Sequence, residues 1–251
     1  MHKTIENLNY IQNQINSKIL KLNTNNYNPK IIAISKTFKI DHILPLIGHG
    51  HRDFGENKVQ EALEKWTEIK KENKNIKLHM VGKLQTNKVK FILPLFDFIH
   101  SLDNLKLAKK ISEEQKKHKI KPKIFIQINI GNESQKSGII KSQLTEFYNE
   151  CLNLGLDIVG TMCLPPLDKD PNIYFSEMKK ITSVLKLNNI SMGMSEDYLK
   201  AIEYSSTYLR IGSRIFGARS LFINIFVFLL INFTRIKKSF FDNAIHPAVG
   251  L

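Results

Sequence analysis

The chain has 251 residues, of which 42% are hydrophobic and 24% are charged. This is an ordinary globular composition, which excludes a disordered or fibrous protein, and the length fits one large domain or two small ones. The formal net charge is +14, but the lysines are scattered among Asn and Ile and are not clustered with aromatic residues. The charge therefore indicates a compositional bias, and we expect no specific nucleic-acid partner.

The cysteines and the N-terminal segment limit the compartment. Cys151 and Cys163 are too few for a disulfide framework, and no Cys/His spacing indicates a zinc or other metal site. The first 22 residues contain no uninterrupted apolar segment, so they do not resemble a signal peptide. These features predict a protein of the reducing cytoplasm without a bound metal.

Short apolar segments alternate with segments of helical periodicity along the chain. An amphipathic helix over about 3–22 comes first, and strands are predicted at 31–35, 52–54, 77–82, 97–101, 124–130, 156–163, 189–194 and 208–212. The clearest later helices span 57–73, 101–118 and 141–155, with Gly155 at a C-cap position. This alternation predicts an α/β protein with a (β/α)₈ barrel. A doubly wound open sheet is the alternative, although no GxGxxG turn follows the first strand.

The last part of the sequence departs from this alternation. The apolar segment "LFINIFVFLLINF" (221–233) is interrupted by Asn224 and Asn232 and is followed by the basic "TRIKKSFF". It is shorter than the roughly 20 residues that span a bilayer, so we expect no membrane span. We therefore assign residues 1–219 to the barrel and 220–251 to an atypical tail. The tail could cover a barrel face, lie in a membrane interface or have no selected structure.

A lysine ends the first predicted strand, within "IIAISKTF" (31–38). Ile32, Ile34 and Lys36 share one face of this strand. On its own the pattern is typical of a strand-end lysine whose ammonium group reaches water. In a barrel, however, the carboxyl ends of the strands carry the chemistry. Lys36 is therefore also a candidate functional amine.

Two later segments have the composition of an anion site. "SMGMS" (191–195) and "RIGSRIFG" (210–217) follow the seventh and eighth predicted strands. They supply small residues, hydroxyl groups, backbone N–H groups and the start of a short helix. The first and eighth strands are neighbours in a closed barrel, which places Lys36 beside this site. A lysine next to a phosphate site is the arrangement that holds pyridoxal 5′-phosphate (PLP) as a Schiff base.

Five segments, taken in order, carry a resemblance to a known family: "AISKT" (33–37), "RDFGENKVQEALEKW" (52–66), "GKLQTNK" (82–88), "SMGMSEDYLKAI" (191–202) and "STYLRIGSRIFGAR" (206–219). They resemble the motifs of the pyridoxal phosphate homeostasis protein family, single-domain barrels of the alanine racemase N-terminal domain type. The resemblance extends over residues 5–219. It implies a PLP-binding barrel.

The resemblance also implies a role for individual residues. Lys36 corresponds to the Schiff-base lysine, Arg210 to the arginine that faces the pyridine nitrogen, and Asn57 to an asparagine of the cofactor pocket. Lys136 corresponds to a further family lysine near the barrel mouth. The cofactor-binding loops, including those that bind the phosphate, would contain Ser191, Met192, Ser195, Gly212 and Ser213.

Some positions depart from the family pattern or look structural. Lys58 stands where the family more often has Tyr, Ser205 where Gly is usual, and Ser213 where Thr is common; Ser213 keeps the hydroxyl and the N–H group. We expect the isolated His79 and His100 to pack or form hydrogen bonds rather than to catalyse, because neither has a neighbouring base motif.

Two functions remain open: a carrier that holds PLP and supplies it to apo-enzymes, and a PLP-dependent enzyme related to alanine racemase. Racemisation needs an acid or base on each face of the substrate, and in alanine racemase the second comes from an additional β-domain, which residues 220–251 are too few to build. An arginine opposite the pyridine nitrogen also makes PLP a weaker electron sink. We therefore expect a monomeric cytoplasmic PLP carrier with transient apo-enzyme partners and no catalytic residue.

Overall fold

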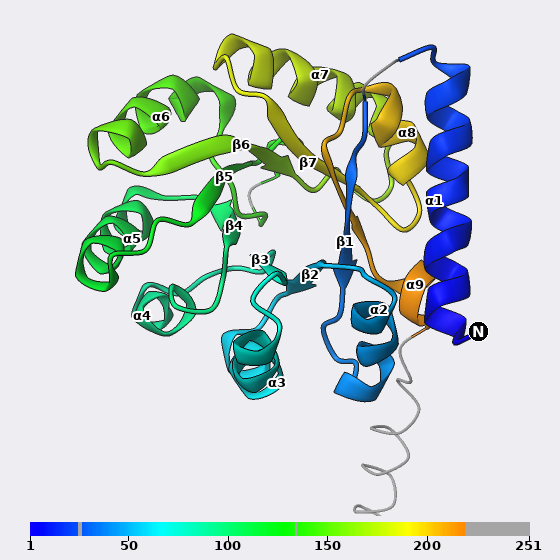
Figure 1. Cartoon of the computed structure of the whole chain (residues 1–251). Helices are drawn as coiled ribbons and strands as arrows, with labels where there is room; N and C mark the ends of the chain where they lie inside the picture. Colours follow the sequence, from blue (N-terminus) through cyan, green and yellow to red (C-terminus); the bar gives the residue numbers. More distant parts are fainter. Residues whose placement is uncertain (25–26, 134, 219–251) are drawn as a thin grey trace, which may run out of the picture. The chain divides into compact units, whose positions relative to one another are not determined.

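The computed structural model describes residues 1–24, 27–133 and 135–218. Within these residues, eight parallel strands close into a barrel in sequence order, so that β8 pairs with β1 (Figure 1). The predicted (β/α)₈ barrel is confirmed, and the open-sheet alternative is wrong. The strands are β1 (Lys30–Ile34), β2 (Asp53–Glu56), β3 (Lys77–Met80), β4 (Phe98–Leu102), β5 (Lys123–Ile128), β6 (Asp157–Cys163), β7 (Asn189–Met194) and β8 (Tyr208–Ile211).

Helices connect the strands and lie outside the barrel (Figure 1). The four helices expected from the sequence are found with their ends shifted by a few residues, and Gly155 follows α6 with a φ of +73°. The α-helices are α1 (Lys3–Lys21), α2 (Leu44–Gly48), α3 (Val59–Glu72), α4 (Val89–Ile92), α5 (Leu105–His118), α6 (Leu144–Asn153), α7 (Pro171–Val184), α8 (Tyr198–Glu203) and α9 (Ser213–Phe216). Short 3₁₀ turns occupy Ile40–His42, Thr86–Lys88 and Lys141–Gln143.

The strands bury both of their faces, as expected for a parallel sheet covered by helices. The outer face packs against the helices; there Phe54 of β2 lies 4.9 Å, centroid to centroid, from the ring of Trp66 on α3. The inner face fills the barrel lumen with a separate apolar cluster. This cluster contains Ile32, Ile34, Phe98, Phe125, Met162 and Tyr208. Alternation along each strand therefore decides which side chains can reach a site in the lumen.

The N-terminal helix fixes the segment that follows β8. α1 lies beside α8 and α9 (Figure 1). Its apolar side chains Leu8, Ile11 and Ile15 are buried, at the spacing of one helix face. Asn7 of α1 also donates a hydrogen bond of 2.9 Å to the carbonyl oxygen of Ile215 in α9. The short helix α9 is thus held by contacts from the opposite end of the barrel sequence.

Two further predictions concern the C-terminal tail and membrane spans. The prediction of a tail over 220–251 lies outside the described residues. Within residues 1–24, 27–133 and 135–218, no helix is both long enough and apolar enough to cross a membrane.

Candidate functional site

Lys36 lies at the carboxyl end of β1, in the turn that directly follows the strand. Ile32 and Ile34, which precede it at alternate positions, belong to the lumen cluster. Lys36 continues this alternation two residues beyond Ile34 and is half-buried. The next residue, Thr37, has a φ of +69°, in the left-handed region that residues other than glycine rarely adopt. The lysine therefore lies at the mouth of the barrel, on a tight turn.

Side chains of α3 hold this turn on both sides of Lys36. The Lys65 ammonium group donates a 2.9 Å hydrogen bond to the carbonyl oxygen of Ser35, and the Glu61 carboxylate accepts one from the N–H of Thr37. Lys65 and Glu61 also pair with each other at 2.9 Å. The backbone before and after Lys36 is thus fixed by one ion pair on the neighbouring helix.

A buried carboxylate completes this support. Glu56, at the end of β2, is fully buried, and its Oε1 accepts hydrogen bonds from the Ser35 hydroxyl at 2.7 Å, from Lys65 at 3.0 Å and from the Trp66 indole at 3.0 Å. Charge-assisted hydrogen bonds of this kind are strong and geometrically specific. They order the end of β2 and the turn after β1 as one unit.

The segment after β8 approaches β1 closely. Gly212 links β8 to α9, and a Cβ atom built on it would lie 3.3 Å from the Cβ of Ile34 and 3.4 Å from its carbonyl oxygen. The N–H of Gly212 donates to the Ser195 hydroxyl at 3.3 Å. Ser213, the first residue of α9, is exposed, and the N–H of a first helical residue has no acceptor within its helix. Backbone donors and a hydroxyl group therefore gather next to the end of β1.

Asn57 presents an unsatisfied acceptor at the same end of the barrel. It follows β2, and its Oδ1 atom is buried without a hydrogen-bond partner. Gly82, after β3, packs so tightly here that a Cβ atom on it would lie 2.3 Å from the Asn57 carbonyl oxygen. A buried acceptor without a donor costs free energy. The position therefore favours a ligand that can donate a hydrogen bond.

Arg210 of β8 and Ser191 of β7 meet inside the lumen. Arg210 is buried, with 5% of its surface exposed, and donates through Nη1 to the Ser191 hydroxyl at 2.6 Å and through Nη2 to the Cys163 carbonyl oxygen at 2.7 Å. Ser191 is fully buried, and its hydroxyl lies 2.9 Å from Nδ1 of His100. The Ser191 hydroxyl thus has two partners in the lumen, His100 and Arg210. Its contact with the phosphate of a ligand stays a prediction.

Met192 and Lys136, two further expected residues, differ in where their side chains lie. The Met192 side chain is fully buried in the outer layer, where it packs with the main hydrophobic core, so only its backbone could face a ligand. Lys136 lies in the loop after β5 and pairs with Glu133 at 2.7 Å, and it donates to the Pro165 carbonyl oxygen at 3.4 Å. These contacts tie the β5 loop to the segment after β6.

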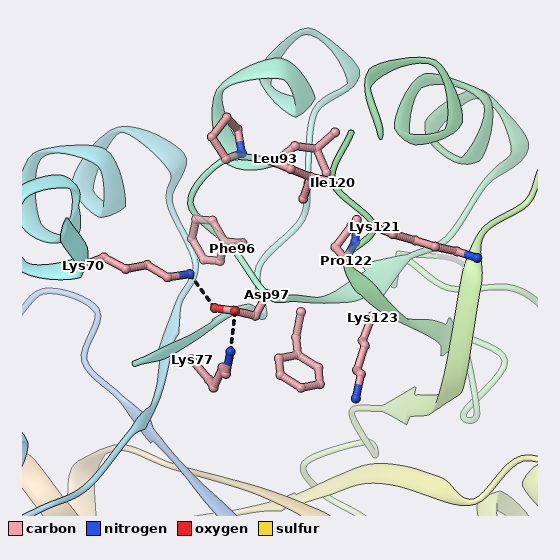
Figure 2. Close-up of a pocket in the computed structure, with 11 residues that line it drawn as sticks. Lys70, Lys77, Leu93, Phe96, Asp97, Ile120, Lys121, Pro122 and Lys123 are labelled. Carbon is pink, nitrogen blue, oxygen red and sulfur yellow. Dashed lines mark hydrogen bonds and ion pairs between the residues drawn. The ribbon is translucent and has the colours of Figure 1, made fainter. Parts of the chain in front are cut away.

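A cavity of about 270 Å³ lies at the other end of the barrel (Figure 2). Its lining includes the first residues of β3, β4 and β5, so it opens at their amino ends. Asp97 is held there between Lys70 and Lys77, with 3.1 Å between its Oδ1 and the Lys77 nitrogen. Lys121 and Lys123 on the same rim are exposed. None of the expected site residues lines this cavity.

One set of polar side chains inside the lumen was not predicted from the sequence. Asp53, His79 and His100 lie on β2, β3 and β4 and are joined by hydrogen bonds of 3.0 Å each. The two histidines do form hydrogen bonds, as expected, but with each other. The available signal was a polar residue on the inner face of three consecutive strands. Glu61 and Lys65, at helical i,i+4 spacing after the buried Glu56, were a second missed signal.

The chain is similar in sequence to proteins of one family. The alanine racemase N-terminal domain model matches residues 9–220. The pyridoxal phosphate homeostasis protein of Haemophilus influenzae is 35% identical over 225 residues, which cover 85% of this chain and 95% of that protein. The protein of the same name from Mus musculus is 35% identical over 213 residues, covering 76% of this chain and 77% of that protein.

Solved structures show the same barrel. PipY of Synechococcus elongatus, determined with PLP bound, is 28% identical with a TM-score of 0.71, and the match covers 81% of this chain and all of that one. Alanine racemase of Clostridium difficile is 14% identical with a TM-score of 0.64, over 86% of this chain and 57% of that one, which shows a common fold. With the barrel and the ordered motifs, these matches show that the chain belongs to the pyridoxal phosphate homeostasis protein family.

Proposed function

We propose that this protein binds PLP at the carboxyl end of the barrel as a Schiff base on Lys36 and supplies it to apo-enzymes in the cytoplasm. The observation that carries the proposal is the pairing of β8 with β1, which brings the Gly212 segment against Ile34, two residues before Lys36. An amine and a group of anion donors from distant parts of the sequence thereby share one site. The family and the PLP-bound PipY structure support the same ligand.

The residues at the mouth fit the chemical groups of PLP. Backbone N–H groups of Gly212 and Ser213, with the hydroxyls of Ser195 and Ser213, would hold the phosphate. The partnerless Oδ1 of Asn57 would accept a hydrogen bond from the ligand, whose ring carries a hydroxyl group. The contacts of Lys65 and Glu61 keep the backbone on both sides of Lys36 in place, so that the amine is positioned before the ligand arrives.

Arg210 would face the ring nitrogen. A guanidinium group is a donor that stays protonated, so the lone pair of the ring nitrogen would accept its hydrogen bond and the nitrogen itself would stay unprotonated. Bound PLP supplies an aldehyde that bonds reversibly to an amine and, with an unprotonated ring, a weakened electron sink. These properties suit a protein that holds and releases the cofactor more than one that turns over a substrate.

The cofactor assignment is tested with the purified chain and PLP. We expect an absorbance band of the lysine-bound cofactor, its loss on treatment with borohydride, and a reduced pyridoxyl group on the peptide that contains Lys36. The same spectrum is recorded with pyridoxal, which lacks the phosphate and should bind more weakly. Labelling that maps to another lysine at the same occupancy would refute the proposed site.

A transfer experiment tests the carrier function. Protein loaded with PLP, freed of excess ligand, should activate an apo-PLP enzyme. In parallel, L-alanine incubated with the loaded protein in deuterated water should show no inversion beyond that caused by free PLP. Inversion with deuterium incorporation at about 1 per second or faster, the range of ordinary enzymes, would instead support the alternative of a PLP-dependent enzyme.

A further inference from the structure

A chain of buried hydrogen bonds crosses the lumen from the amino end of the barrel towards Arg210. Asp53 Oδ1 lies 3.0 Å from His79 Nε2, and His79 Nδ1 lies 3.0 Å from His100 Nε2. His100 Nδ1 then lies 2.9 Å from the Ser191 hydroxyl, which accepts from Arg210 at 2.6 Å. The two histidines and Ser191 are fully buried. Only Asp53, the first residue of β2, has an appreciable exposed fraction, 19% of its side chain.

The ends of this chain allow one direction for its protons when both histidines are neutral. The Asp53 carboxylate can only accept, so His79 must carry its proton on Nε2 and accept at Nδ1. His100 must then donate from Nε2 and accept at Nδ1, which receives the hydroxyl proton of Ser191. The Ser191 oxygen is left as an acceptor, and the guanidinium group of Arg210 is the donor that fills it. Both ring nitrogens of each histidine and the Ser191 hydroxyl then have a hydrogen-bond partner.

Aromatic rings hold the ring planes of both histidines, and burial favours their neutral forms. The His79 ring stacks on Phe98 with 4.3 Å between centroids, and the His100 ring stacks on Phe125 at 4.2 Å. Burial lowers the pKa of His79 although Asp53 raises it. Burial also lowers the pKa of His100 well below its usual value, and repulsion from a protonated His79 or from Arg210 acts in the same direction. A neutral pair in fixed ring planes is what the one-way chain requires.

The surroundings of the Arg210 guanidinium group include the last residue of this hydrogen-bond chain, Ser191. Among the described residues, no carboxylate forms an ion pair with its guanidinium group, and Asp197 acts on it only as a nearby charge. Its described partners are a hydroxyl and a carbonyl oxygen. The Ser191 hydroxyl donates its proton to His100, so it can only accept from the guanidinium group. The chain therefore keeps the position and direction of this cation constant.

We propose that Asp53, His79, His100 and Ser191 are positioning residues for Arg210, and that their one-way hydrogen-bond chain holds its guanidinium group against the ring nitrogen of PLP. This inference rests on the proposed function, because it assumes that PLP is the ligand at the mouth. It assigns a function to polar side chains of four different strands that meet in the lumen. It also predicts which bound ligands should respond when the chain is broken.

The first test needs no cofactor. Nitrogen-15 NMR of the histidines in the PLP-free protein should show both His79 and His100 as neutral tautomers with the proton on Nε2, assigned by comparison with His79→Gln and His100→Gln. A proton on Nδ1 of His100, or a doubly protonated His79 at neutral pH, would reverse the donor direction and overturn the inference. This result is independent of whether the protein binds PLP.

The second test compares PLP with its 1-deaza analogue, in which C–H replaces the ring nitrogen. Ser191→Ala removes the acceptor of a charge-assisted hydrogen bond and should weaken PLP binding about tenfold. Asp53→Asn leaves the size of the side chain unchanged but replaces a group that can only accept with an amide that can also donate, so the direction of the hydrogen bonds is no longer fixed. It should have a smaller effect in the same direction. Binding of the analogue should change little in either variant. His49→Gln, an exposed histidine bonded to Asn9, is the matched control.

The outcomes separate the two proposals. Equal losses for PLP and the analogue in Ser191→Ala, or no loss for either, would overturn the positioning function. If the wild-type protein binds both ligands equally, Arg210 does not act on the ring nitrogen, and this inference fails while the cofactor site stands. If it binds neither ligand, the proposed function itself has failed.

Discussion

The two ends of the barrel both carry lysines, but they constrain them differently. At the carboxyl end, Lys36 lies in a turn whose flanking backbone is bonded to Glu61 and Lys65 of α3. At the amino end, Lys121 and Lys123 are exposed on the rim of the cavity in Figure 2. With a net charge of +14, cationic side chains occur at both ends of the barrel, so their number does not identify the candidate site. The presence of a cavity does not identify it either. What marks it is a lysine on an ordered turn beside the Gly212 segment and the Ser195 hydroxyl.

Replacing one lysine from each end gives the largest expected contrast. Lys36→Ala should abolish the absorbance of lysine-bound PLP and the borohydride labelling, because only a positioned primary amine forms the Schiff base. Lys123→Ala, at the amino end, should leave both unchanged. Spectra and peptide mapping of the two variants make the measurement. Labelling retained in Lys36→Ala but lost in Lys123→Ala would move the site to the cavity.

The phosphate donors give the next largest effect. Ser195→Ala combined with Ser213→Ala should weaken PLP binding by about 1–3 kcal/mol, the scale of hydrogen bonds to a charged acceptor. Pyridoxal, without a phosphate, should respond much less, and Lys121→Ala at the amino end should affect neither ligand. Titration calorimetry with both ligands provides the affinities. If the double variant loses PLP and pyridoxal to the same extent, the phosphate is held elsewhere.

At the amino end we expect an effect on stability and none on the ligand. Burial alone would raise the pKa of Asp97, but hydrogen bonds from Lys70 and from the N–H of Leu78 lower it below its usual value. Asp97→Asn should therefore lower the free energy of unfolding by about 1 kcal/mol at neutral pH, measured by urea denaturation, with PLP affinity unchanged.

The pH dependence of this variant has a definite sign. A carboxyl group whose folded-state pKa is depressed stabilises the fold above its unfolded pKa of about 3.9, and this contribution is lost as the pH falls through the folded value. The gap between wild type and Asp97→Asn should thus be full at neutral pH and close below about pH 4. A gap that stays constant in acid would show that the charge of Asp97 does not contribute.

The smallest effect concerns the turn that enters β8. Ser205, where the family usually has Gly, has a φ of +64°. Ser205→Gly should relieve about 1 kcal/mol of backbone strain, partly offset by the greater freedom of glycine in the unfolded chain, for a net gain of about 0.5 kcal/mol. Ser17→Gly in α1, an exposed helical position, should instead destabilise by about 0.5 kcal/mol. Thermal unfolding of both variants should show shifts of opposite sign, and a loss in both would contradict the strain argument.

The fold was predictable to the level of every strand, and the physical reason is local. Most of the buried parallel strands are short apolar segments between helical segments, so their length and this alternation locate them. The short helices α2 and α4, of 5 and 4 residues, were not predicted, because segments this short cannot show a helical periodicity. Their formation depends on packing against neighbouring elements, which local sequence does not describe.

The site was predictable where a motif assigns a residue to a strand end, as for Lys36, Asn57 and Gly212. The site was not predictable for a side chain that has more than one possible hydrogen-bond partner. Alternation places Ser191 on the inner face of β7, but it does not say whether its hydroxyl turns to a ligand or to His100 and Arg210. Likewise, two isolated histidines 21 residues apart in sequence become one network only because β3 and β4 are adjacent.

The closing of the barrel by β1 and β8 has a consequence for how the protein is made. Lys36 and Gly212 come from opposite ends of the barrel sequence, so the ligand site does not exist until the last strand has been synthesised and has docked. Contacts of such long sequence separation form late in folding. A ligand that binds only the closed barrel stabilises it by mass action, by about 2.7 kcal/mol at a hundredfold excess over Kd. If that ligand is PLP, its concentration would then affect both the loading of this protein and the time that each newly made copy survives proteolysis.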